Sequence, residues 1–267
     1  MNENQLHPVL ITGAGPGDPE LLTVKAYEAI RSADILLYDC MPARYVLDII
    51  REDAEVVYLC KNHGAPEDEL KSHSLNVIDH LEKFYYEGKK VVRLKAGDAF
   101  MFGGGGHETE LLTSRNIPFD VLPGLTAGAA AANLYGVKIS EKDESDLVMY
   151  YIGFSIKDNF NQVRQIANLL HSGGTLILYM ADDNLKDITS VLKSEGVPGT
   201  MPTVVVGMAS LPDEDCVSAT LDTITEETDK KVMLMPFTYF IGKHVKATIK
   251  TREKMLNKSL LLQEETF

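Results

Sequence analysis

The stretch VLITGAGPGD, residues 9–18, decides the fold class of this chain. Its first four residues are apolar or β-branched and predict a strand, and the glycines that follow let the backbone approach a ligand closely. Asp18 can then cap a helix with Pro19 at its first position. This order is typical of an α/β cofactor-binding domain, although a plain tight turn explains the same residues. A dinucleotide fingerprint needs glycine where this chain has Asp18, which disfavours a nicotinamide cofactor.

Short apolar runs alternate with longer helical patterns through the first half, which predicts a parallel sheet with crossover helices. We expect strands at residues 9–12, 35–38, 56–59, 91–94 and 119–122, and helices after Asp18, over 67–87 and over 108–114. In the second half we expect strands at 148–152, 175–179, 204–206, 217–221 and 237–241, with helices only between the earlier ones. That spacing favours a mixed sheet. The expected domains are 1–122 and 123–247, both α/β, followed by a helical tail over 248–267.

Composition excludes several classes of partner. The 267 residues carry a formal charge of −13, so the average surface repels nucleic acid and anionic lipid. Three widely spaced cysteines do not form a disulfide framework, and no His/Cys spacing indicates a metal site. The polar N-terminus and the lack of a long apolar run predict a cytoplasmic protein without a signal peptide or membrane span.

Two further glycine-rich turns follow predicted strands, where an open α/β sheet presents its ligand-binding edge. The second turn, residues 95–100, is followed by four consecutive glycines, Gly103 to Gly106, which suggests that something packs closely against them. The third turn, residues 123–128, opens a run of very small residues. Asp39 ends the second strand and Lys61 follows the third. Each has a simpler reading, Asp39 as a surface or capping carboxylate and Lys61 as a solvated lysine.

Four motifs in this order resemble the tetrapyrrole methylase family: GAGPGD at 13–18, LYD at 37–39, VVRLKAGD at 91–98 and PGLTA at 123–127. The resemblance runs from Val9 to about Ala247 and is strongest to members that methylate uroporphyrinogen III. It implies a two-domain α/β fold, with a mostly parallel N-terminal sheet, a mixed C-terminal sheet and a cleft between the domains for S-adenosylmethionine. It also implies a homodimer and a C-methyltransferase that makes precorrin-2 for siroheme or cobalamin biosynthesis.

The resemblance also implies roles for individual residues. Asp39 and Lys61 match positions with proton-handling roles in the family. Cofactor contacts fall on Pro16, Ala96, Gly97, Asp98, Thr126, Ala127, Met180 and Ala209. A tetrapyrrole with many carboxylates needs basic partners, and the candidates are Arg44, Lys61, Arg93 and Lys95. No metal is required, because an electron-rich pyrrole carbon can attack a sulfonium methyl directly when both are held in line.

Departures from the family pattern concentrate on the substrate side. Ala99 replaces a proline, Gly104 an arginine and His107 a glutamate, and residues 136–142, GVKISEK, replace the family's Gly-Ile-Pro-Leu-Thr-His-Arg. Two alternatives therefore stay open: a methylase of the same fold that acts on another tetrapyrrole, such as a later corrin intermediate, and a protein that binds the cofactor without catalysis.

Overall fold

The computed structural model describes residues 5–39, 42–59, 67–153 and 160–249. The chain divides into two compact units, Met1–Ala127 and Gly128–Phe267, a few residues after the boundary expected at 123. Most of the predicted tail, from residue 250 onward, lies outside the described residues. In the described part of the chain, no helix is both long enough and apolar enough to cross a membrane.

The first unit contains a parallel five-stranded sheet in the order β3-β2-β4-β1-β5. Its strands are β1 (Val9–Gly13), β2 (Ile35–Tyr38), β3 (Glu55–Tyr58), β4 (Val91–Lys95) and β5 (Phe119–Leu122). The predicted strands are confirmed to within one residue at either end. Since all five strands run the same way, their carboxyl ends lie along one edge of the sheet.

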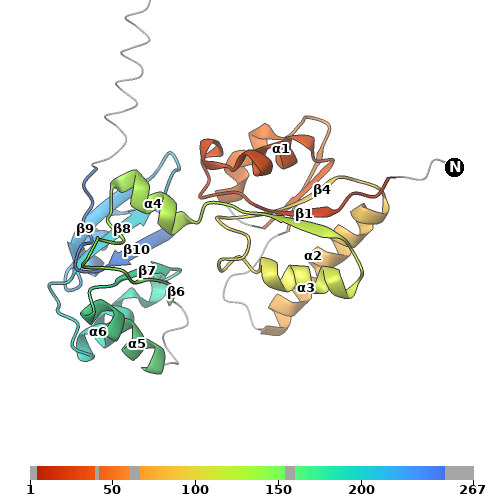
Figure 1. Ribbon diagram of the computed structural model, residues 1–267. Helices are drawn as coiled ribbons and strands as arrows, with labels where there is room; N and C mark the ends of the chain where they lie inside the picture. The colour runs from red at the N-terminus through yellow and green to blue at the C-terminus, as the bar shows by residue number, and fades with distance from the viewer. Residues whose placement is uncertain (1–4, 40–41, 60–66, 154–159, 250–267) are drawn as a thin grey trace, which may run out of the picture. The chain divides into compact units, whose positions relative to one another are not determined.

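Helices cover both faces of this sheet (Figure 1). They are α1 (Val24–Ser32), the 3₁₀ segments η1 (Pro19–Leu21) and η2 (Pro42–Ile49), α2 (Glu67–Tyr86) and α3 (Gly105–Ser114). The strand side chains alternate between two cores. Ile35, Leu37 and Val91 pack with α2 and α3, whereas Leu36, Val92 and Leu94 pack with α1 and η2. On β4, Arg93 and Lys95 continue the series begun by Val91, so they point to the α3 face.

The predicted start of the first helix was wrong. Asp18 accepts a hydrogen bond from the Glu20 amide at 2.9 Å, but it caps only the short segment η1. The α-helix begins at Val24, where the Thr23 hydroxyl accepts from the Ala26 amide at 3.2 Å. Asp18 and Thr23, five positions apart, each cap a separate helical segment, and the first segment is a single 3₁₀ turn.

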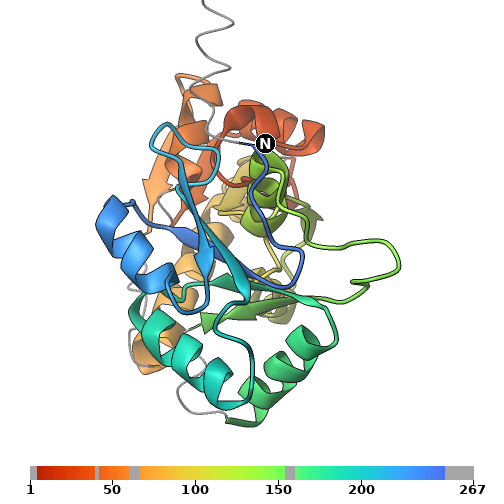
Figure 2. The same cartoon turned by 90° about the vertical axis from the view of Figure 1, so that its left-hand side faces the viewer.

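The second unit contains a mixed sheet in the order β6-β7-β10-β8-β9, in which only β6 and β7 pair in parallel. Its strands are β6 (Val148–Ile152), β7 (Thr175–Tyr179), β8 (Pro202–Gly207), β9 (Asp215–Thr220) and β10 (Phe237–Ile241). The predicted mixed sheet is confirmed. One face packs against α5 (Phe160–His171), α6 (Leu185–Ser194) and Ile224 of α7 (Ile224–Lys231), and the other against α4 (Ala127–Tyr135). Figures 1 and 2 show α5 and α6 together on one side of these strands.

The expectation of helices only between the earlier strands of this half was wrong, because α7 lies between β9 and β10. Its sequence, ITEETDKK, is almost entirely polar, and Ile224 is its one buried residue. A helix with so small an apolar face gives no periodic signal in the sequence.

Candidate active site

The three glycine-rich turns meet at the carboxyl edge of the parallel sheet. They follow the neighbouring strands β4, β1 and β5, and their glycines are in backbone-to-backbone contact. A Cβ atom added to Gly13 would lie 2.6 Å from the Gly97 carbonyl oxygen and 2.6 Å from the amide nitrogen of Gly124. A Cβ atom at Gly124 would clash with the same Gly97 oxygen, and Gly97 has a φ of +63°. Gly13 and Gly124 are therefore needed for space, and Gly97 for its backbone conformation.

Hydrogen bonds join the same turns. Gly15 and Gly97 exchange backbone hydrogen bonds, at 3.1 Å from the Gly15 amide and 2.7 Å from the Gly97 amide. The Asp98 carboxylate accepts from the amides of Phe100 at 2.9 Å and Met101 at 3.0 Å, and more weakly from Gly124 at 3.4 Å. Asp98 thus fixes the loop after β4 against the loop after β5. The result is a rigid edge made largely of backbone, which suits close contact with a small ligand.

Two of the four consecutive glycines, Gly103 and Gly105, have a local packing reason. A Cβ atom at Gly103 would lie 2.8 Å from the Ala99 carbonyl oxygen, and Gly105 donates its amide to that same oxygen at 3.0 Å. Gly104 has a φ of +76° with nothing within 4 Å of its Cβ direction. What lies against Gly103 and Gly105 is therefore the protein's own backbone, while the space at Gly104 is open.

Four charged side chains form a buried cluster beside these turns, here called the ionic tetrad: Asp39, Arg93, Lys95 and Glu108. The Arg93 guanidinium donates to the Asp39 carboxylate and, at 2.9 and 3.1 Å, to both oxygens of Glu108. The Lys95 ammonium lies 2.7 Å from Glu108 and 3.4 Å from Asp39. Each cation therefore bridges the same two carboxylates.

Burial makes this arrangement electrostatically demanding. Arg93 has no exposed surface, and Asp39, Lys95 and Glu108 are each exposed by less than a tenth. Burial alone would raise the pKa of Glu108, but Arg93 and Lys95 together hold that pKa below its ordinary value. Burial likewise opposes the charge on Arg93, and the two carboxylates more than offset it, so the pKa of Arg93 is raised. The two cations and the two carboxylates pair within the tetrad, so their formal charges cancel.

The sequence-predicted residues of the first unit fall into three groups. Pro16 is buried, and Ala96, Gly97, Asp98, Thr126 and Ala127 are half-buried in the joined turns. Asp39, Arg93 and Lys95 belong to the ionic tetrad. Arg44, on η2, is exposed, and its guanidinium carbon lies 5.9 Å from the centre of the Tyr45 ring. Lys61 lies outside the described residues, so its role stays a prediction, as does substrate contact by Arg44, Arg93 and Lys95.

In the second unit, the predicted cofactor residues Met180 and Ala209 lie at one sheet edge. They follow β7 and β8, which both pair antiparallel with β10 and so end on the same side. Met180 has a φ of +51°, and Ala209 lies between Met208 at +49° and Ser210 at +70°. Left-handed backbone at non-glycine residues costs about 1 kcal/mol or more each and is typical of binding sites. A cofactor-binding role for Met180 and Ala209 stays a prediction.

Glu108 is the functional candidate that the sequence reasoning missed. In the sequence it marks only the expected start of a helix, yet it binds both cations of the tetrad. A signal was present in β4, where Arg93 and Lys95 alternate with the apolar residues Val92 and Leu94. Two cations on one face of a central strand require acidic partners, and Glu108 is a carboxylate in the helix that follows that strand.

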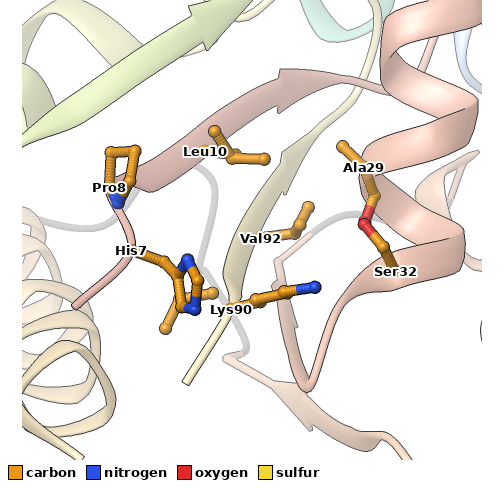
Figure 3. Close-up of a pocket in the computed structure, with 8 residues that line it drawn as sticks. His7, Pro8, Leu10, Ala29, Ser32, Lys90 and Val92 are labelled. Atoms are coloured by element: carbon orange, nitrogen blue, oxygen red, sulfur yellow. The ribbon is translucent and has the colours of Figure 1, made fainter. Parts of the chain in front are cut away.

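A separate pocket lies at the opposite edge of the parallel sheet (Figure 3). His7, Pro8 and Leu10 line it at the start of β1, and Lys90 and Val92 at the start of β4. It is therefore at the amino ends of the strands, away from the joined turns. Within the described ranges of the chain, no group of three or more His, Cys, Asp or Glu side chains could hold a metal ion.

Comparison with known proteins identifies the family. The model of the family "Tetrapyrrole (Corrin/Porphyrin) Methylases" matches residues 8–225. The chain is 36% identical over 235 residues to a uroporphyrinogen-III C-methyltransferase of Bacillus subtilis, covering 88% of this chain and 89% of that protein. It is 32% identical to a siroheme synthase of Actinobacillus pleuropneumoniae, over 99% of this chain but 56% of the relative. The chain thus spans about half the length of several siroheme synthases that it matches.

Solved structures agree with this assignment. A uroporphyrin-III C-methyltransferase of Thermus thermophilus, in complex with S-adenyl homocysteine, has a TM-score of 0.72 and 29% identity, covering 89% of this chain and 98% of that one. A cobalt precorrin-4 methyltransferase has a TM-score of 0.75 and 25% identity, covering 88% and 94%. The predicted family and its two-domain α/β fold are confirmed: this chain belongs to the tetrapyrrole methylase family.

Proposed function

We propose that this protein transfers a methyl group from S-adenosylmethionine to a ring carbon of uroporphyrinogen III, as a step toward precorrin-2. The observation that carries the proposal is the convergence of three glycine-rich turns at the carboxyl edge of the parallel sheet, next to the buried carboxylate of Asp39. Similarity to the uroporphyrinogen-III C-methyltransferase of Bacillus subtilis, over 88% of this chain and 89% of that protein, supports the choice of acceptor.

The residues of the joined turns fit a small cofactor. Gly13, Gly97 and Gly124 leave no side chain between the turns. Backbone atoms of Thr126 and Ala127 lie 3.8 Å from the position that a Cβ atom on Gly97 would take. A surface of fixed backbone groups and small side chains can hold a ligand closely without reorganising. In the second unit, Met180 and Ala209 are proposed to add contacts from their sheet edge.

The proposed chemistry requires little beyond positioning and one base. S-adenosylmethionine, when bound, supplies an electrophilic methyl group on a sulfonium centre. Methyl transfer leaves the substrate with an added positive charge, so the methylated substrate must then lose a proton, and a carboxylate can take it. Asp39 is proposed as that base, with Lys61 as its partner in proton handling. Arg44, which is exposed, is the proposed source of positive charge for the carboxylates of the acceptor, whereas Arg93 and Lys95 are paired within the tetrad and are proposed to act on Asp39.

Calorimetry followed by turnover tests this function. We expect purified protein to bind S-adenosylhomocysteine and then to methylate uroporphyrinogen III when supplied with S-adenosylmethionine. Asp39→Asn should keep the affinity for S-adenosylhomocysteine within a few-fold and lose at least about 100-fold in the rate of methyl transfer, because it removes the proton-accepting carboxylate and keeps the size of the side chain. Tight binding without methylation of uroporphyrinogen III by the unmodified protein would rule out this acceptor.

A second acceptor is favoured by one specific observation. Gly104 stands where the family usually has arginine, and its Cβ direction is open. Losing a basic side chain removes a partner for an acceptor carboxylate and adds room, which suits a differently substituted tetrapyrrole. The similarity in fold to a cobalt precorrin-4 methyltransferase fits this alternative. Assaying methyl transfer to a panel of reduced corrin precursors would separate it from the first proposal.

A further inference from the structure

The ionic tetrad contains one carboxylate that the proposed chemistry does not use. Glu108 lies on α3 with both of its oxygens bound to Arg93, and its Oε1 also accepts from the Lys95 ammonium at 2.7 Å. Its side chain is as buried as that of Asp39, about 7% exposed in each case. A buried carboxylate that shares its cationic partners with a second acid weakens the hold of those cations on the second acid.

Sheet geometry determines which group shares them. In the parallel pairing of β2 with β4, Leu37 lies opposite Arg93, so Asp39 follows β2 at the level of Lys95. Arg93 and Lys95 lie on the α3 face, and Glu108 reaches them from the first turn of that helix. Asp39 approaches the same two cations from the end of β2. The carboxylates of Asp39 and Glu108 therefore share one pair of cations.

Without Glu108, Asp39 would face two buried cations alone. A carboxylate bound by two cations is held firmly in its ionised form and is a poor proton acceptor. With Glu108 present, the formal charges of the tetrad sum to zero, and each cation divides its interaction between two acids. Glu108 also anchors the guanidinium of Arg93 through two hydrogen bonds, which fixes the direction from which Arg93 donates to Asp39.

We propose that Glu108 is a positioning residue for the base of the methyl-transfer reaction: it holds Arg93 and Lys95 in place and balances their charge so that Asp39 can accept a proton. This inference rests on the proposed function, since it needs Asp39 to act as a base. It assigns to Glu108 no contact with cofactor or acceptor.

Other charged groups on the described elements around Asp39 lie elsewhere. On β3, which pairs with the other side of β2, the one charged residue is Glu55, opposite Ile35 at the amino end of the strand. On η2, Arg44 and Asp48 are both exposed. The ion pairs described for Asp39 are those with Arg93 and Lys95 of the tetrad. Lys61, its proposed partner, lies outside the described residues.

Three variants of the full chain test the proposal. Glu108→Gln keeps the size and removes the charge, whereas Glu108→Asp keeps the charge and shortens the side chain. Glu110→Gln is the matched control, because Glu110 lies on the same helix with its side chain 81% exposed. For each, we would measure the affinity for S-adenosylhomocysteine, and the single-turnover rate of methyl transfer as a function of pH with a tetrapyrrole that the unmodified protein methylates.

The charge-balance role predicts a specific order. Glu108→Gln should lower the transfer rate at least about 10-fold and move the acidic limb of the pH profile to lower pH, because Asp39 becomes harder to protonate. Glu108→Asp should retain most of the rate, and Glu110→Gln all of it. All three should bind S-adenosylhomocysteine within about two-fold of the unmodified protein, which also shows that each has folded.

The opposite order would overturn the inference. If Glu108 only fills space, Glu108→Gln will be as active as the unmodified protein and Glu108→Asp will be the weaker variant, with no movement of the pH profile. A variant that fails to bind S-adenosylhomocysteine would likewise assign Glu108 to the stability of the fold. If the unmodified protein binds S-adenosylhomocysteine but methylates no tetrapyrrole, the proposed function itself fails, and the positioning role fails with it.

Discussion

The contact among Gly13, Gly97 and Gly124 gives a sharp prediction for the substitution Gly13→Ala. The new Cβ atom would lie 2.6 Å from each of three backbone atoms: the carbonyl oxygen of Gly97, and the amide nitrogen and Cα of Gly124. Ordinary contact requires about 3.5 Å, so the turns must separate by about 1 Å. Because every obstructing atom belongs to the backbone, no side chain can rotate away to relieve the clash.

Two consequences follow from a separation of that size. Overpacking of this kind costs about 1–3 kcal/mol, and three simultaneous backbone clashes favour the upper end, about 3 kcal/mol of unfolding free energy. A displacement of about 1 Å in a positioned site lowers a rate by about 100-fold. Gly13→Ala should therefore unfold at clearly lower urea concentration, as followed by circular dichroism, should transfer methyl groups about 100-fold more slowly and should bind S-adenosylhomocysteine more weakly.

Gly106→Ala is the matched control for this substitution. Gly106 lies within α3, and its Cβ direction meets only the Phe100 ring, at 3.8 Å. Alanine in a helix is more favourable than glycine by about 0.5–1 kcal/mol, so this variant should be equal to or slightly more stable than the unmodified protein. If Gly13→Ala unfolds at the same urea concentration as Gly106→Ala and binds S-adenosylhomocysteine equally well, the three turns do not close on one another as described.

Three further predictions concern stability and reactivity. Arg93→Gln leaves two buried carboxylates short of a cation and should lower the unfolding free energy by about 3–5 kcal/mol near neutral pH. Because the pKa of Glu108 is lowered in the fold, the stabilisation from ionised Glu108 is present above the ordinary value of 4.5 and is lost as the pH falls through the lowered value. Urea titrations should therefore show the difference in stability between the variant and the unmodified protein shrinking below about pH 4.5. Thr23→Ala removes the cap of α1 and should lower the unfolding free energy by about 1 kcal/mol, whereas an unchanged urea midpoint would contradict the capping role. Burial raises the pKa of Cys216 to about 12, so iodoacetamide at pH 8 should modify it far more slowly in the folded protein than in urea, as measured by peptide mass spectrometry; equal rates would contradict its burial.

The strands were predictable because their signal is local. The runs at 35–38, 119–122 and 237–241 coincide with strands of the structure, since each is short, apolar or β-branched and bounded by polar or turn residues. The edge at which the turns gather was predictable too, because every parallel strand of the first sheet ends on the same side. Two helices were predicted wrongly. The helix α7 was missed because it has almost no apolar face, and the start of α1 was misplaced because Asp18 and Thr23 are both capping residues.

The ionic tetrad shows the limit of local reasoning. Asp39 was identified from its place after a strand and from the family motif, and Arg93 and Lys95 from their charge. Their mutual contacts depend on Leu37 lying opposite Arg93 in the β2–β4 pairing, which joins residues 56 positions apart. The partner on α3 depends further on which face of the sheet that helix covers. Neither relation has a period or a spacing that can be read along the chain.

The sequence by itself determined the family, the α/β class of both units, most strand positions and the three glycine-rich turns, because each of these depends on short segments of neighbouring residues. Only the tertiary structure decided that Gly13, Gly97 and Gly124 touch, that Glu108 joins Asp39, Arg93 and Lys95, and that Arg93 is buried. The physical reason is that burial and ion pairing are set by contacts between distant segments. The same charged residue is a solvated surface group or part of a buried tetrad according to what the fold places against it.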